Sequence, residues 1–165
     1  MKRLSTLVVL AAVALALCVV TASAQTTPEV PLSIAHRGPL TGKPGALFNQ
    51  TKDSFSEGRF GPYTIVGDYP ASHTLVVKRS NIDSANWSRW AYCKMGPMDL
   101  LDSLRDGSVT MTIRFAPTTR WITWVLVKAE FTGTYGLGST VKQTECISTG
   151  VLEEDMLRRL GVNVP

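Results

Sequence analysis

Histidine and cysteine are scarce in this chain, and that scarcity limits its chemistry. The 165 residues include two histidines, His36 and His73, and three cysteines, Cys18, Cys93 and Cys146. A zinc site needs three or four side-chain ligands, which two isolated histidines and distant cysteines do not supply. We therefore expect no metal site and no cofactor.

Runs of lysine or arginine are also lacking. The formal net charge of the whole chain is +4. A protein that binds nucleic acid along its backbone must neutralise several phosphates with clustered basic side chains. The sequence therefore predicts no nucleic-acid partner.

The N-terminus has the three parts of a secretory signal peptide. Lys2 and Arg3 form a positive start, residues 7–20 are uncharged and almost wholly apolar, and Ala22-Ser23-Ala24 supplies the small residues that a signal peptidase reads. The apolar stretch of about 14 residues is shorter than the roughly 20 that a transmembrane helix needs. We expect residues 1–24 to be removed, leaving a periplasmic or secreted protein with no membrane span. A retained membrane anchor is the alternative.

Removal of residues 1–24 changes both the charge and the cysteine count. It takes away two basic and no acidic residues, so the net charge falls from +4 to +2. It also leaves Cys93 and Cys146 as a pair, and an even number of cysteines in an oxidising compartment favours a disulfide. Closing a loop of about 54 residues stabilises a fold by roughly 4 kcal/mol in the chain-entropy model. We predict a Cys93–Cys146 disulfide, with two free buried thiols as the alternative.

Proline and glycine recur between residues 25 and 62 and break any long regular element. We predict an extended lead over residues 25–62, within which only residues 46–60 have enough apolar side chains to dock on a core. A single domain should follow over residues 63–165.

The pattern within residues 63–165 predicts strands and two helices. Apolar residues alternate with polar ones over residues 109–115, as in a half-buried strand. Further strands are expected over residues 63–66, 73–79, 87–95, 121–134 and 141–148.

The first predicted helix is short and has Pro97 at its first position and Asp106-Gly107 at its end. The second covers residues 150–160, where an acidic first turn and a basic last turn suit the helix dipole. The whole predicts an α+β fold, in which an antiparallel sheet is packed by a short internal helix and a C-terminal helix. A small β-barrel with a C-terminal helix is the alternative.

The sequence shows no catalytic set. Ser72 and His73 lie near Asp68, but a Ser–His–Asp triad depends on convergence in space, and no GxSxG motif is present. Carboxylates in the ranges 99–106 and 153–155 could suit glycoside hydrolysis, yet helix-end electrostatics explains both groups. We predict no catalytic residue.

The four tryptophans fall in two WxxW pairs, Trp87/Trp90 and Trp121/Trp124. In a strand, a spacing of three points two side chains to opposite faces, so each pair should offer one ring to the core and one elsewhere. An uncovered ring would mark a contact surface for a sugar, a lipid or another protein. We take all four as candidate binding residues. The alternative is that all four belong to the core.

These features favour a small exported, non-enzymatic protein. It would be a binding or envelope-accessory module whose partner is an unknown envelope protein, glycan or lipid. Two alternatives remain open: a small extracellular hydrolase that uses carboxylates or His73, and a subunit of a larger envelope assembly.

Overall fold

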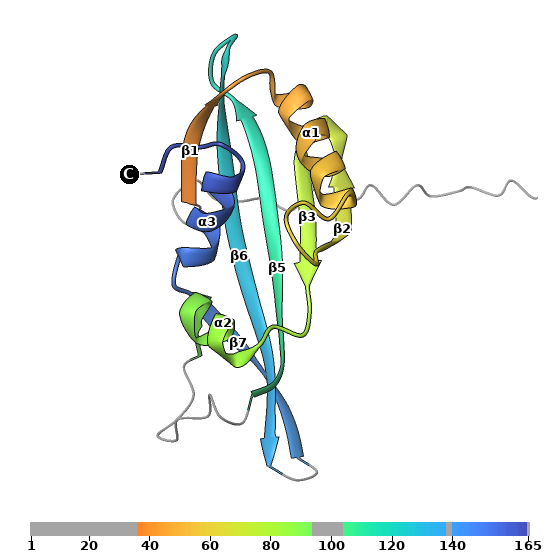
Figure 1. The fold of residues 1–165 in the computed structure, drawn as a ribbon, viewed down its shortest axis with the longest axis vertical. Coiled ribbons are helices and arrows are strands. Elements are labelled where there is room, and N and C mark those ends of the chain that lie inside the picture. Colours follow the sequence, from red (N-terminus) through yellow and green to blue (C-terminus); the bar gives the residue numbers. More distant parts are fainter. Residues whose placement is uncertain (1–35, 94–103, 138–139, 165) are drawn as a thin grey trace, which may run out of the picture.

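The computed structural model describes residues 36–93, 104–137 and 140–164. They form one antiparallel sheet of seven strands, and the three α-helices all lie on one face of it (Figure 1). Within these residues the sheet does not close on itself, because β2 and β4 stand at its two edges. The predicted α+β fold is therefore confirmed, and the barrel alternative is wrong. The predicted signal peptide and residues 97–103 of the predicted internal helix lie outside the described ranges.

The order of strands across the sheet is β2-β3-β5-β6-β7-β4, and β1 pairs with β6. Along the chain the elements are β1 (His36–Thr41), α1 (Pro44–Ser56), β2 (Thr64–Tyr69), β3 (Thr74–Arg79), α2 (Ser84–Trp90), β4 (Ala91–Tyr92), β5 (Leu104–Pro117), β6 (Ile122–Leu137), β7 (Thr140–Ser148) and α3 (Val151–Arg159).

The long strand β6 has three partners. One edge pairs with β5 from Pro117↔Thr123 to Leu104↔Tyr135. The other edge is divided, because β1 pairs with residues 122–127 and β7 pairs with residues 131–137. Residues 128–130 therefore lie between two partner strands on that edge.

A buried carboxylate from α3 occupies this interval. Glu153 is 3% exposed, and its Oε1 accepts a hydrogen bond from the backbone N–H of Ala129 at 3.2 Å. Its Oε2 accepts from the Ser148 hydroxyl at 2.8 Å, and the Ser148 oxygen in turn accepts from the N–H of Gly150 at 3.0 Å. A buried charge is tolerated when it is hydrogen-bonded in this way. The carboxylate thus replaces the missing strand partner and ties β6 and β7 to the start of α3.

The core lies between the sheet and the helices. Alternate residues of β5 and β6 are buried on the helix side, namely Val109, Met111, Ile113, Phe115, Val125, Val127, Ala129 and Phe131. The helices cover them with apolar side chains that include Phe48 and Phe55 of α1, Trp87 of α2 and Met156 of α3. The alternation predicted for residues 109–115 is confirmed.

The strands predicted over residues 63–66, 73–79, 121–134 and 141–148 correspond to β2, β3, β6 and β7, and the predicted C-terminal helix corresponds to α3. The predicted disulfide is also confirmed, since Cys93 is bonded to Cys146. It links the end of β4 to β7, and the Trp87 indole N–H donates to the Cys93 sulfur at 3.3 Å. In the described ranges no helix is long and apolar enough to cross a membrane.

Residues 36–56 correct the expectation of an extended lead, because they form β1 and α1. Pro44 stands at the start of α1, where its fixed φ and missing N–H are favourable. Phe48, Thr51 and Phe55 follow at helical spacing and are buried. Gly38 lies so close to Val162 that a Cβ would clash with its side chain. These prolines and glycines therefore mark a helix start and a close contact.

The strand predicted over residues 87–95 is mostly a helix. Asp83 caps α2 by accepting a hydrogen bond from the Asn86 N–H at 2.8 Å, and only Ala91–Tyr92 form β4. The predicted end of the internal helix at Asp106-Gly107 is also wrong, since both residues lie in β5. Gly107 is required by packing, because a Cβ there would clash with the Trp87 ring.

Replacement of Glu153 tests whether its carboxylate holds the divided edge of β6 together. We expect Glu153→Ala to lower the free energy of unfolding by about 2–3 kcal/mol, because the buried Ala129 N–H and the half-buried Ser148 hydroxyl lose their acceptor. The adjacent surface substitution Glu154→Ala should cost only about 0.5 kcal/mol. Urea unfolding followed by tryptophan fluorescence gives both values. Equal losses in the two variants would contradict the role of Glu153.

Removal of the disulfide tests the second link between distant segments. The variant Cys93→Ala/Cys146→Ala should lose about 2–4 kcal/mol of unfolding free energy, because the unfolded chain regains the freedom of the open loop. Dithiothreitol should produce the same loss in the native sequence and none in the double variant. Alkylation of both thiols in the unreduced, denatured protein, detected by mass spectrometry, would show that the bond is absent.

Candidate binding surface

The structure separates the four candidate tryptophans into two groups. Trp87 and Trp90 belong to α2 and are buried. The Trp87 ring meets Phe131 of β6 edge-on, with ring centroids 5.6 Å apart. The spacing of three puts both tryptophan rings on the same side, because they lie on a helix instead of a strand. Trp121 is 59% exposed and Trp124 is half-buried. Of the four tryptophans, only Trp121 and Trp124, in the β5–β6 hairpin, are therefore available for a contact surface.

Trp124 lies on the sheet face that carries no helix. Its neighbours Thr123 and Val125 are buried toward the helices, so Trp124 points to the other side. In the strand register it stands between Pro39 of β1 and Ala116 of β5. The guanidinium carbon of Arg37 is 5.4 Å from the centroid of the Trp124 ring, within the range of a cation–π contact.

Trp121 stands in the turn of the β5–β6 hairpin. The guanidinium carbon of Arg120 is 5.3 Å from its ring centroid. The Trp121 carbonyl accepts a hydrogen bond from the Gly42 N–H at 3.0 Å, and the Thr123 hydroxyl donates to the Gly42 carbonyl at 2.7 Å. The turn is thereby held against the loop between β1 and α1, and the exposed ring is carried on a fixed backbone.

The charge around these two rings is of one sign. Residues 36–52 and 107–129 contain basic side chains and no acidic ones. Within them Lys52 pairs with Asp68, and Lys128 pairs with Glu130. Among the described residues, no carboxylate lies within 4.0 Å of the remaining basic groups, which are Arg37, Lys43, Arg114 and Arg120. We refer to Arg37, Arg114, Arg120, Trp121 and Trp124 as the Trp/Arg surface.

The sequence reasoning missed two parts of this surface. Arg37 belongs to β1, which was expected to be part of an extended lead, so its position beside Trp124 could not be anticipated. Arg120 directly precedes Trp121, and this adjacency was a signal that could have been used. Arg114 is one of the polar residues that alternate with the buried row of β5.

The residues considered for hydrolysis do not converge in the described part of the chain. Asp68 pairs with Lys52, the Ser72 hydroxyl donates to Thr74 Oγ1 at 3.1 Å, and the His73 ring packs against Phe48 at 6.2 Å. Glu153 holds the sheet together, as described above. No group of three His, Cys, Asp or Glu side chains in the described residues could hold a metal ion.

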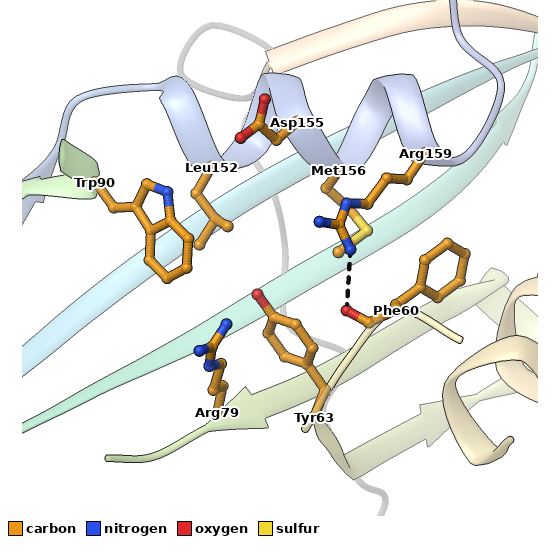
Figure 2. A pocket seen from close by; sticks show the side chains of 8 residues that line it. All are labelled: Phe60, Tyr63, Arg79, Trp90, Leu152, Asp155, Met156 and Arg159. Carbon is orange, nitrogen blue, oxygen red and sulfur yellow. Dashed lines mark hydrogen bonds between the residues drawn. The ribbon is translucent and has the colours of Figure 1, made fainter. Parts of the chain in front are cut away.

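A small pocket lies on the helix side of the sheet (Figure 2). It is bounded by the end of β3, residues 60–63, the end of α2 and one side of α3. Its cavity of about 40 Å³ holds a few water-sized groups, since one water needs roughly 10–15 Å³ by this measure. Trp90 borders it, so this ring faces a pocket rather than the outer surface.

Arg79 is one of three charged residues that line this pocket, with Asp155 and Arg159. Its guanidinium carbon is 5.3 Å from the Trp90 ring centroid and 6.0 Å from that of Tyr63. Burial raises the pKa of the Tyr63 hydroxyl, and the nearby Arg79 charge offsets only part of this effect. Tyr63 is therefore neutral at physiological pH.

Comparison with known proteins gives no assignment. No protein-family model matches the sequence, and no curated protein matches it significantly.

Substitution of single tryptophans tests their division into core and surface. Trp87→Ala should lower the free energy of unfolding by about 3–5 kcal/mol, because a large buried ring is lost. Trp121→Ala should change it by less than about 0.5 kcal/mol. Thermal and urea unfolding measure both values. A large loss of stability in Trp121→Ala would place this ring in the core and remove it from the contact surface.

Proposed function

We propose that this chain is an exported binding protein, without catalytic activity, that uses the Trp/Arg surface to bind an acidic glycan in the cell envelope or outside the cell. The observation that carries the proposal is the pair of guanidinium–indole contacts at one end of the sheet, Arg37 with Trp124 and Arg120 with Trp121.

The chemistry of these contacts suits a sugar that bears negative groups. An arginine that rests on an aromatic face keeps the N–H groups at its edge available for carboxylate, sulfate or phosphate oxygens. The indole ring offers a flat apolar surface with little conformational entropy to lose. Trp124 and Arg37 lie along adjacent strands, so an extended polymer could contact both.

A glycan is favoured over a lipid bilayer by the position of Trp124. The ring is half-buried on the sheet and lies next to Arg37, whereas insertion into a membrane requires protruding apolar side chains. At this end of the described structure only two large apolar side chains, Trp121 and Ile122, have high exposure. They offer little apolar surface for insertion into a membrane.

Two features support export. The N-terminal sequence has the pattern of a signal peptide. The Cys93–Cys146 disulfide is typical of proteins in oxidising, extracytoplasmic compartments. Either a periplasmic or a secreted location is consistent with both.

Binding to polysaccharides of different charge tests the proposal. Mature protein should bind polygalacturonate and not dextran, and the affinity should fall as salt screens the arginines. Trp124→Ala and Arg37→Gln should each weaken binding about fivefold, since an exposed cation–π or ionic contact contributes of the order of 1 kcal/mol. Isothermal titration calorimetry measures the affinities.

Two matched controls come from outside the Trp/Arg surface. Arg59 is an exposed arginine paired with Glu57, and Tyr92 is an aromatic residue with 66% exposure. Arg59→Gln and Tyr92→Ala should bind polygalacturonate as the native protein does. Equal binding to dextran, or binding only to anionic lipid vesicles, would refute the glycan proposal.

One observation favours the alternative of a subunit in a larger assembly. Tyr92 and Ile147 are opposite each other in the β4–β7 register and are 66% and 64% exposed. They form an apolar pair where β4 meets β7, beside the middle of β6.

A further inference from the structure

The pocket on the helix side contains hydrogen-bond donors that no described residue satisfies. Arg79 Nε and Trp90 Nε1 are both buried without a hydrogen-bond partner. Trp90 is 7% exposed, so its indole N–H is shielded from bulk water. Buried polar groups in proteins are nearly always paired, and two unpaired donors beside one cavity therefore indicate a place for an acceptor.

The two rings beside Arg79 hold its side chain in position. Figure 2 shows Trp90 and Tyr63 next to the guanidinium, with the Tyr63 hydroxyl facing the same space. Arg79 has no carboxylate within 4.0 Å among the described residues. The Arg79 side chain is half-buried, and its charge is not neutralised by a described carboxylate.

The other charged groups at the pocket are already engaged. Asp155 accepts hydrogen bonds from Arg89 at 3.5 Å and from Arg158 at 3.3 Å, one on each carboxylate oxygen. Arg159 donates to the Phe60 carbonyl at 3.3 Å (Figure 2). The described residues supply no carboxylate within 4.0 Å for either Arg79 or Arg159, but Arg159 already donates to a carbonyl, whereas Arg79 Nε has no acceptor.

We propose that this pocket binds a carboxylate, held by the Arg79 guanidinium beside the Trp90 ring. A planar guanidinium presents parallel N–H groups that match the two oxygens of a carboxylate. The cavity of about 40 Å³ holds a few water-sized groups, which is room for the carboxylate at the end of a short stem. Leu152 and Met156 of α3 line the pocket and provide apolar surface for the stem. The carboxylate belongs either to a small organic acid or to the C-terminus of a peptide.

This site is independent of the Trp/Arg surface. Arg79 follows Leu75 and Val77 on the side of β3 that faces the helices, and both of these residues are fully buried there. Arg37 and Trp124 lie on the opposite face. The two proposals can therefore fail separately.

The indole N–H signal of Trp90 provides a direct readout. In ¹⁵N-labelled mature protein this signal is assigned by its loss in Trp90→Phe and then followed during titration with sodium propionate. We expect a saturable shift that sodium chloride at the same ionic strength does not produce. Parallel titrations with a short peptide carrying a free C-terminus, and with its C-terminal amide, distinguish the two sources of the carboxylate.

Variants of Arg79 test the assignment. Arg79→Gln should weaken propionate binding at least about tenfold, and Arg79→Lys should also weaken it, because lysine keeps the charge but lacks the parallel N–H groups. Arg59→Gln is the matched control and should bind as the native protein does. If Arg79→Gln does not fold, Arg79→Lys decides the question. Native-like binding in Arg79→Lys, an identical shift with sodium chloride, or tighter binding of inorganic phosphate than of propionate would overturn the proposal.

Discussion

The divided edge of β6 is the constraint on which the arrangement of this protein depends. On one edge, β6 pairs with β1 along its first half and with β7 along its second half. A short stretch of β6 between these two partners therefore has no partner strand on that edge. Here the Glu153 carboxylate supplies the acceptor that a continuous partner strand would have provided at Ala129. Because Glu153 belongs to α3, the same contact also fixes this helix over the sheet. The last helix and the middle strand are thus joined through a single buried side chain.

Both candidate sites follow from this arrangement. The pairing of β1 with the first half of β6 brings Arg37 to Trp124 on the face without helices. The position of α3 over the other face closes the pocket beside Arg79. One face of the sheet therefore carries a basic aromatic surface, and the other face carries a small pocket beside Arg79.

Several elements were predicted correctly from the spacing of side chains within short segments of the sequence. The alternation over residues 109–115, the charged ends of α3 and the pairing of Cys93 with Cys146 were all correctly interpreted. Gly38 and Gly107 were misleading, because each is required by a contact with a residue distant in the chain, Val162 or Trp87.

The candidate sites show the same division between local and tertiary information. The sequence singled out Trp121 and Trp124, but it could not separate them from Trp87 and Trp90, since the same spacing of three has opposite meanings in a helix and in a strand. The contact of Arg37 with Trp124 is formed only in the tertiary structure. The same is true of the position of Arg79 beside the Trp90 and Tyr63 rings. They depend on strand pairings and helix docking that a single sequence does not state.

The route of β1 has a consequence for the order of folding. Its partner strand β6 lies near the other end of the chain, and the side chain that completes the shared edge comes later still, in α3. Pairings between distant segments are slow to form, and a chain that emerges from its N-terminus must wait for them. A nascent chain that ends before α3 therefore exposes an incomplete sheet edge, and the native state becomes available only after the C-terminal helix has been released.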